Sequence, residues 1–176
     1  LLELGLAANE QNLGKDHEDV AQSLNNLAEL YRLQNDDLNA EPLFQRALTI
    51  WKTKLGPDHP NVGIALNNLG LIFKRQQKYG RAEESYQTAL KIREKTLGRE
   101  DPSVAASLNN LASLYYRQGR YVEAEPLFKR AIEIIEKTVG NAHPRYAKGA
   151  RNYAILLRKL DRLKDAESIL SSIGSK

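Results

Sequence analysis

The sequence repeats itself every 42 residues, and this period constrains the fold more than any other feature. Val20, Val62 and Val104 are equivalent positions, and the segments 18–59 and 102–143 are identical at 21 of 42 positions. Such a period is typical of solenoid proteins, in which each repeat buries its apolar surface against its neighbours. We predict one solenoid domain over residues 1–176: the end of a preceding repeat's second helix at 1–14, repeat 1 at 18–59, repeat 2 at 60–101, repeat 3 at 102–143, and a short or truncated repeat 4 at 144–176.

Each repeat carries the pattern of two helices separated by a short turn. The first helix begins at a proline such as Pro60 or Pro102, because a fixed φ angle and a missing N–H suit the first helical position. Apolar residues then follow helical spacing, as Leu66 and Leu69 do. Gly140 ends a second helix, where a positive φ angle suits glycine. The chain contains no alternating run of strand type, so we predict an all-α fold.

Small residues recur at one position of the first helices. Ala28, Gly70 and Ala112 lie in segments of the type "L..LA..Y", and an alanine and an aromatic residue follow, as at Ala40 and Phe44. This pattern resembles the tetratricopeptide repeat, and the 42-residue length with "LNNLA" and "GPDHP" is similar to the kinesin light chain type of that family. The resemblance implies a right-handed superhelical solenoid of antiparallel helix pairs. It also implies a protein-interaction module whose first helices line a concave groove.

Adjacent asparagines stand in the middle of three first helices, although asparagine is unfavourable there. At about 100° per residue, Asn25 and Asn26 point away from the core side that Leu24 and Tyr31 define. A carboxamide can pair with both the C=O and the N–H of a peptide backbone, so we predict that these side chains hold an extended peptide. The alternative is that one asparagine of each pair fixes the packing of neighbouring repeats. The predicted ladders are Asn25, Asn67, Asn109 and Asn26, Asn68, Asn110, with Asn152 continuing the second although "ARNYA" replaces "LNNLA" there.

Charge is distributed unevenly along the chain. The net charge of +4 divides into −3 over residues 1–88 and +7 over residues 89–176, which favours an acidic partner of the basic half. We predict an acidic peptide with an aromatic or aliphatic anchor, and tryptophan-plus-acidic cargo motifs are what the kinesin light chain resemblance implies. Basic residues that end first helices also complement the helix dipole. The predicted selecting residues are the cations Lys74, Arg75, Arg117, Lys148, Arg151, Arg158 and Lys159, and the apolar side chains Ile64, Leu71, Tyr116 and Ile155.

Several classes of chemistry are absent from the sequence. There is no cysteine, which excludes disulfides and thiolate sites, and no catalytic or phosphate-binding motif is found. His17, His59 and His143 share one position, where Asp101 stands in the second junction, and this recurrence favours turn or N-cap chemistry over zinc binding. We therefore expect neither an enzyme nor a cofactor. The sequence has no apolar run that could span a membrane and no signal-peptide pattern, and we expect a cytoplasmic protein.

The sequence is also compatible with other functions. The repeats could form a structural spacer or self-association module through exposed terminal helices, or a sensor region of a larger signalling enzyme. Nucleic acid is the weakest candidate partner, because aromatic platforms alternating with basic groups are not evident. Trp51 aligns with Arg93 and Ile135, so we expect its indole to be partly exposed or at a local seam.

Overall fold

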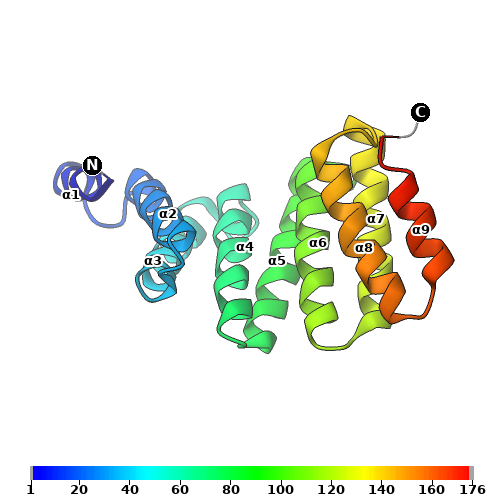
Figure 1. The fold of residues 1–176 in the computed structure, drawn as a ribbon. Coiled ribbons are helices and arrows are strands. Elements are labelled where there is room, and N and C mark those ends of the chain that lie inside the picture. Colours follow the sequence, from blue (N-terminus) through cyan, green and yellow to red (C-terminus); the bar gives the residue numbers. More distant parts are fainter. Residues whose placement is uncertain (1, 175–176) are drawn as a thin grey trace. The chain divides into compact units, whose positions relative to one another are not determined.

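The computed structural model describes residues 2–174, and over this range the chain forms nine α-helices joined by short turns, without strands (Figure 1). The short turns make consecutive helices antiparallel neighbours. The helices are α1 (Leu2–Leu13), α2 (Glu18–Leu33), α3 (Asp37–Leu55), α4 (Pro60–Arg75), α5 (Tyr79–Leu97), α6 (Pro102–Arg117), α7 (Tyr121–Val139), α8 (Pro144–Lys159) and α9 (Leu163–Ser171).

The chain forms two compact units. Unit 1 ends at Ile92 and unit 2 begins at Arg93, so α5 contributes its first part to unit 1 and its last turns to unit 2. In unit 1, α2 packs against α3, and α4 packs against both of them. In unit 2, α7 packs against α6 and α8, and α9 covers α8. The division into four repeats stays a prediction.

The sequence signals at the helix ends are confirmed. Helices α4, α6 and α8 begin at prolines, and Gly140 follows α7 with a φ angle of 81°. The N-cap prediction for the recurrent histidine position is also correct, because each cap side chain accepts a hydrogen bond from the backbone N–H two residues later. The distances are 3.2 Å for His17 Nδ1, 3.2 Å for His59 Nδ1, 2.7 Å for Asp101 Oδ1 and 3.1 Å for His143 Nδ1.

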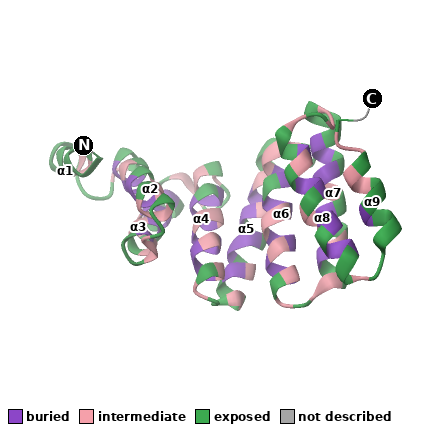
Figure 2. Cartoon of the chain, in the orientation of Figure 1, coloured by how far each residue is buried: buried purple, intermediate pink, exposed green. Residues whose placement is uncertain are grey.

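The core lies where first and second helices face each other, along the buried sides seen in Figure 2. Small residues of first helices are matched to aromatic residues of second helices. Gly70 and Tyr86 form such a pair in unit 1, since a Cβ atom on Gly70 would lie 2.6 Å from a ring carbon of Tyr86. Equivalent positions, 42 residues to either side, hold the pairs Ala28 with Phe44 and Ala112 with Phe128, all buried.

Trp51 departs from the expectation. Its side chain is 1% exposed and is the largest of the fully buried side chains, so the prediction of partial exposure is wrong. The prediction assumed that a position held by arginine in another repeat is exposed to solvent. Arg93 is in fact only partly exposed, and it donates a hydrogen bond of 2.6 Å to the buried Ser107 hydroxyl. This position accommodates either an apolar side chain or an arginine that finds a polar partner.

Tyr153 on α8 gives unit 2 a pH dependence. It is 6% exposed and its hydroxyl donates to Glu125 Oε1 at 3.1 Å. Burial, and then the Glu125 carboxylate, raises the pKa of Tyr153 to about 12. A raised pKa in the folded state means that the neutral phenol stabilises the fold below its unfolded pKa of about 10.

We expect this contribution to the free energy of unfolding to be complete below about pH 10 and lost as the pH rises through about 12. Tyr153→Phe keeps the packed ring but has no phenol to ionise. In urea unfolding from pH 9 to pH 12, the free energy of unfolding should therefore decrease less with pH for the variant than for the wild type. Parallel losses in both proteins would contradict the assignment to Tyr153.

Candidate functional site

Polar side chains recur at helical spacing on α6 and on α8 in unit 2. Asn109, Tyr116 and Arg117 follow each other on α6 at helical spacing, outside its buried stripe. On α8, residues spaced by three and four positions form a second stripe parallel to the first. We call this surface the α6–α8 face; it consists of Asn109, Asn110, Tyr116, Arg117, Lys148, Arg151, Asn152, Ile155, Arg158 and Lys159.

Two asparagines join the halves of this face. The Asn152 side-chain amide donates to Asn109 Oδ1 at 3.3 Å. Gly149 permits the close approach, because a Cβ atom there would lie 2.9 Å from Ile132 and 3.8 Å from Asn109 Nδ2. One amide of the predicted ladder therefore already links neighbouring first helices, as the packing interpretation expects. Each carboxamide has further hydrogen-bonding capacity, so this link leaves polar groups for a ligand.

The cations of α8 are exposed and uncompensated. Lys148, Arg151, Arg158 and Lys159 are all exposed, and none takes part in an ion pair among residues 2–174. Helix α8 itself contains no acidic residue. Ile155 lies among these cations with 48% of its side chain exposed. On α6, Tyr116 is half-buried and its ring centroid lies 5.4 Å from that of Tyr121.

The corresponding side of unit 1, on α2 and α4, is more engaged in internal contacts. Asn26 accepts a hydrogen bond of 2.9 Å from Gln22, whereas the buried Oδ1 atom of Asn25 has no hydrogen-bond partner among the described residues. Ile64 is 40% exposed. The remaining predicted residues of this side, Asn67, Asn68, Leu71 and Lys74, are half-buried.

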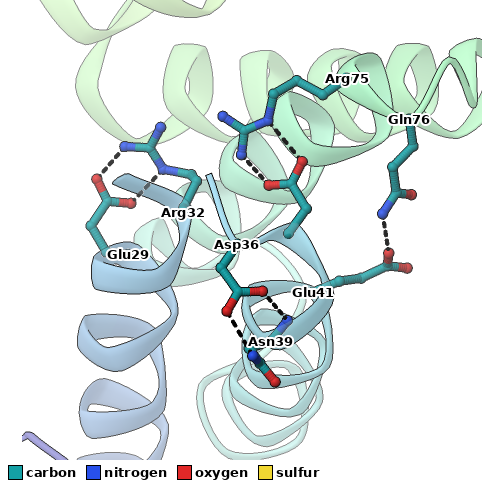
Figure 3. Close-up of polar contacts among 8 residues, drawn as sticks. Glu29, Arg32, Asp36, Asn39, Glu41, Arg75 and Gln76 are labelled. Atoms are coloured by element: carbon teal, nitrogen blue, oxygen red, sulfur yellow. Dashed lines mark hydrogen bonds and ion pairs between the residues drawn. The ribbon is translucent and has the colours of Figure 1, made fainter. Parts of the chain in front are cut away.

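Cations near this side of unit 1 are paired within the chain (Figure 3). The Arg75 guanidinium forms an ion pair with Asp37, in which Nε donates to Oδ2 at 2.8 Å. Arg32 pairs with Glu29 three residues earlier on α2, where Nε donates at 2.8 Å. Glu41 accepts a hydrogen bond of 2.9 Å from Gln76. The charge of Arg75, one of the predicted selecting cations, is therefore compensated within the chain.

The comparisons with known proteins identify the family. The profile of the tetratricopeptide repeat matches residues 36–95 and 103–172. The chain belongs to the tetratricopeptide repeat family. The comparison with curated proteins found no significant match for this tetratricopeptide repeat chain.

Solved structures show the same fold. BtubC (BKLC) from P. vanneervenii is 25% identical, with a TM-score of 0.87 over 97% of this chain and 68% of that chain. A putative kinesin light chain from P. anserina with nearly identical repeats is 24% identical, with a TM-score of 0.82 over 98% and 81% of the two chains. RapI is 17% identical, with a TM-score of 0.80 over 93% and 57%. The predicted all-α solenoid of helix pairs and its kinesin light chain resemblance are therefore confirmed.

Residues 2–174 contain no cluster of three or more His, Cys, Asp or Glu side chains that could hold a metal ion. Within the same range no helix is both long and apolar enough to cross a membrane.

Sequence reasoning missed the acidic partners of the unit 1 cations. Asp37 opens α3, where an acidic residue complements the helix dipole, and Glu29 stands three residues before Arg32 on the same helix, a spacing at which opposite charges attract. The Arg75 pair depends on the start of α3 lying beside the end of α4, and no local sequence signal gives that proximity. Aligning the repeats identifies equivalent positions, but it does not give the distances between side chains on different helices.

Proposed function

We propose that the α6–α8 face binds an extended acidic peptide of a partner protein, so that the chain acts as an adaptor or scaffold rather than as an enzyme. The observation that carries this proposal is the group of exposed, unpaired cations around Ile155 on α8. A cytoplasmic location is part of the same proposal.

Each group on the face has a distinct task in this proposal. Side-chain amides such as Asn110 and Asn152 hold the peptide backbone, because they offer donors and an acceptor. Ile155 and Tyr116 receive an apolar or aromatic anchor, the type of residue that contributes most to binding at interfaces. The α8 cations attract carboxylates, which speeds encounter and makes affinity fall with salt.

Unit 2 is the better candidate for an acidic ligand than unit 1. A carboxylate approaching Arg75 must compete with Asp37, which already occupies the guanidinium. A carboxylate approaching Arg151 or Lys148 displaces only water, because neither has an internal acidic partner. Removing an intramolecular partner reduces the net gain of a new ion pair, which at exposed sites is only about 0.2–1 kcal/mol.

The double variant Lys148→Gln, Arg151→Gln tests the proposal. We expect it to weaken binding of a fluorescein-labelled peptide with four glutamates around one tryptophan by roughly 2- to 30-fold, since two exposed pairs contribute about 0.4–2 kcal/mol. Fluorescence anisotropy at two salt concentrations measures both the affinity and its salt dependence. The salt dependence should also fall in the variant.

A matched control is Lys129→Gln, Lys164→Gln, which removes the same charge from exposed positions of α7 and α9. We expect it to leave the affinity within about twofold of the wild type, because these lysines lie outside the α6–α8 face. Equal losses in both double variants would mean that the net charge, and not this face, attracts the peptide. A wild-type chain that does not bind the labelled peptide at all would overturn the proposal.

Self-association is the second candidate, because α1 buries no side chain and exposes Leu2, Leu4 and Leu13. Exposed apolar surface of this kind is typical of contacts with another chain. Sedimentation velocity of the wild type over a 100-fold concentration range, recorded on the samples used for anisotropy, separates the two functions. A mass that rises with concentration together with absent peptide binding would favour self-association.

A further inference from the structure

Arginine side chains join consecutive second helices at two equivalent junctions. In unit 1, Arg46 on α3 contacts α1: its Nη1 lies 2.5 Å from Glu10 Oε1, and its Nη2 donates to the Lys15 carbonyl at 2.9 Å. In unit 2, Arg130 on α7 makes the same contacts with the residues 84 positions later. Its Nη1 lies 2.5 Å from Glu94 Oε1, and its Nη2 donates to the Arg99 carbonyl at 3.0 Å. We call this arrangement the arginine clamp.

The junction of α3 with α5, which lies between these two in the sequence, lacks the clamp. The position equivalent to Arg46 and Arg130 is Thr88, and the position equivalent to Glu10 is Lys52. This junction therefore has no arginine side chain at the position that Arg46 and Arg130 occupy in the other two junctions. A lysine also replaces the carboxylate that those arginines contact.

A cleft of about 220 Å³ lies at this junction, lined by α3, α4 and α5 of unit 1. Its floor includes Leu66 and Phe73 of α4, and its rim includes Lys52, Glu84 and Thr88. This volume is smaller than the roughly 300–1,000 Å³ of pockets for drug-sized ligands. It therefore suits a group about as large as one amino-acid side chain.

The charges around the cleft favour an acid at the Lys52 end. Lys52 is exposed and forms no ion pair among the described residues. Arg81, at the opposite end, already lies 3.6 Å from Glu41 and stacks 3.9 Å from the Phe73 ring centroid. Glu84 lies one helical turn before Thr88 and disfavours a second carboxylate near Arg81. The cleft thus offers one uncompensated cation above apolar side chains of α4 that expose little surface, with Leu66 at 7% and Phe73 at 3%.

We propose that the α3–α5 cleft is a second ligand site, which binds a carboxylate carried on a single apolar or aromatic group. The apolar group contacts Leu66 and Phe73 on the floor, the carboxylate pairs with Lys52, and the Thr88 hydroxyl can donate to it. A C-terminal phenylalanine of a partner chain and a free aromatic acid share this chemistry. The site is separate from the α6–α8 face and does not depend on the function proposed for it.

The probe for this site is N-acetyl-phenylalanine, and its matched control is the corresponding amide, which lacks the carboxylate. In ¹⁵N-labelled protein we expect the acid to shift the backbone amide resonances of Thr88 and Ser85, and the amide to bind several-fold more weakly. Lys52→Gln should weaken binding of the acid about three- to fivefold, as expected for one exposed ion pair. Lys54→Gln, on the same helix but outside the cleft, should leave it unchanged.

Restoring the clamp gives the sharpest test. The double variant Thr88→Arg, Lys52→Glu reproduces the residue pair of the other two junctions, so we expect it to fill the slot, weaken binding of the acid at least tenfold and raise the melting temperature. Circular dichroism confirms that the variant is folded. Undiminished binding by a folded variant, or no shifts at Thr88 and Ser85 in the wild type at 10 mM probe, roughly the concentration at which millimolar ligands saturate, would overturn the proposal.

A third arm distinguishes the two sources of the ligand. A hexapeptide with C-terminal phenylalanine should bind at least tenfold more tightly than N-acetyl-phenylalanine if a partner chain is the ligand, because its preceding residues add contacts along α3 and α5. Equal affinities would assign the cleft to a free acid. In either case the clamp variant should bind the acidic peptide at the α6–α8 face as the wild type does.

Discussion

Replacing Trp51 by alanine is expected to lower the free energy of unfolding by about 3–5 kcal/mol, the range for removal of a large aromatic side chain from a core. The indole is 1% exposed, and α3 buries it together with Leu48 and Ile50. For a chain of this length the loss corresponds to a decrease of about 6–20 °C in melting temperature. Urea unfolding followed by circular dichroism at 222 nm measures it without relying on the fluorescence that the substitution removes.

Two comparisons make the Trp51 result interpretable. Trp51→Phe keeps an aromatic ring and should recover more than half of the loss, because it leaves a smaller cavity. Leu38→Ala, on the same helix but 86% exposed, should change the free energy of unfolding by less than about 0.5 kcal/mol. If Trp51→Ala cost no more than Leu38→Ala, the indole would not be part of the core.

Periodicity made the fold predictable from the sequence. Proline, glycine and a capping histidine or aspartate recur at 42-residue intervals, and each has a local physical reason to stand at a helix end. The helix boundaries at Pro60, Pro102 and Pro144 follow from this directly. Local conformational preferences depend on a few neighbouring residues. In a periodic sequence the same helix-end signal occurs once per repeat, so each occurrence supports the others.

Side-chain contacts between helices were not predictable in the same way. The exposure expected for Trp51 came from its alignment with Arg93, yet a repeat can bury different side chains at one position if their partners change. Arg93 finds Ser107 at 2.6 Å, whereas the Trp51 side chain is almost fully buried. The pair of Arg75 with Asp37 was missed for the same reason, since it depends on the distance between α3 and α4.

The asparagines illustrate how a site can serve both predicted roles. The hydrogen bond from Asn152 to Asn109 fixes two first helices, while the half-buried Asn110 on the same face lies beside them. Adjacent asparagines on a helix point about 100° apart, so one can face the neighbouring helix while the other faces the groove. In the proposed site, Asn109 would make the packing contact and its neighbour Asn110 would contact the peptide.

Gly70→Ala is expected to lower the free energy of unfolding by about 1–3 kcal/mol, the range for overpacking of a close-packed core. The added methyl group would lie 2.6 Å from a carbon of the rigid Tyr86 ring, which is fully buried. The same substitution at Gly80 in α5 is the matched control, because a Cβ atom there meets nothing within 4 Å. There alanine should stabilise the fold by roughly 0.5–1 kcal/mol through its higher helix propensity. Opposite signs at the two glycines, measured by urea unfolding, would isolate the packing effect.

The residue pairs of the other repeats supply the rescue. Ala28 with Phe44 and Ala112 with Phe128 occupy the positions of Gly70 with Tyr86, so the double variant Gly70→Ala, Tyr86→Phe imports a combination that the same fold already accommodates. Tyr86→Phe alone should be close to neutral, because the buried Tyr86 hydroxyl has no hydrogen-bond partner among the described residues. We expect the double variant to recover at least half of the stability that Gly70→Ala loses. A double variant no more stable than Gly70→Ala would mean that the ring position is fixed by other contacts, and that glycine is required there whichever aromatic residue faces it.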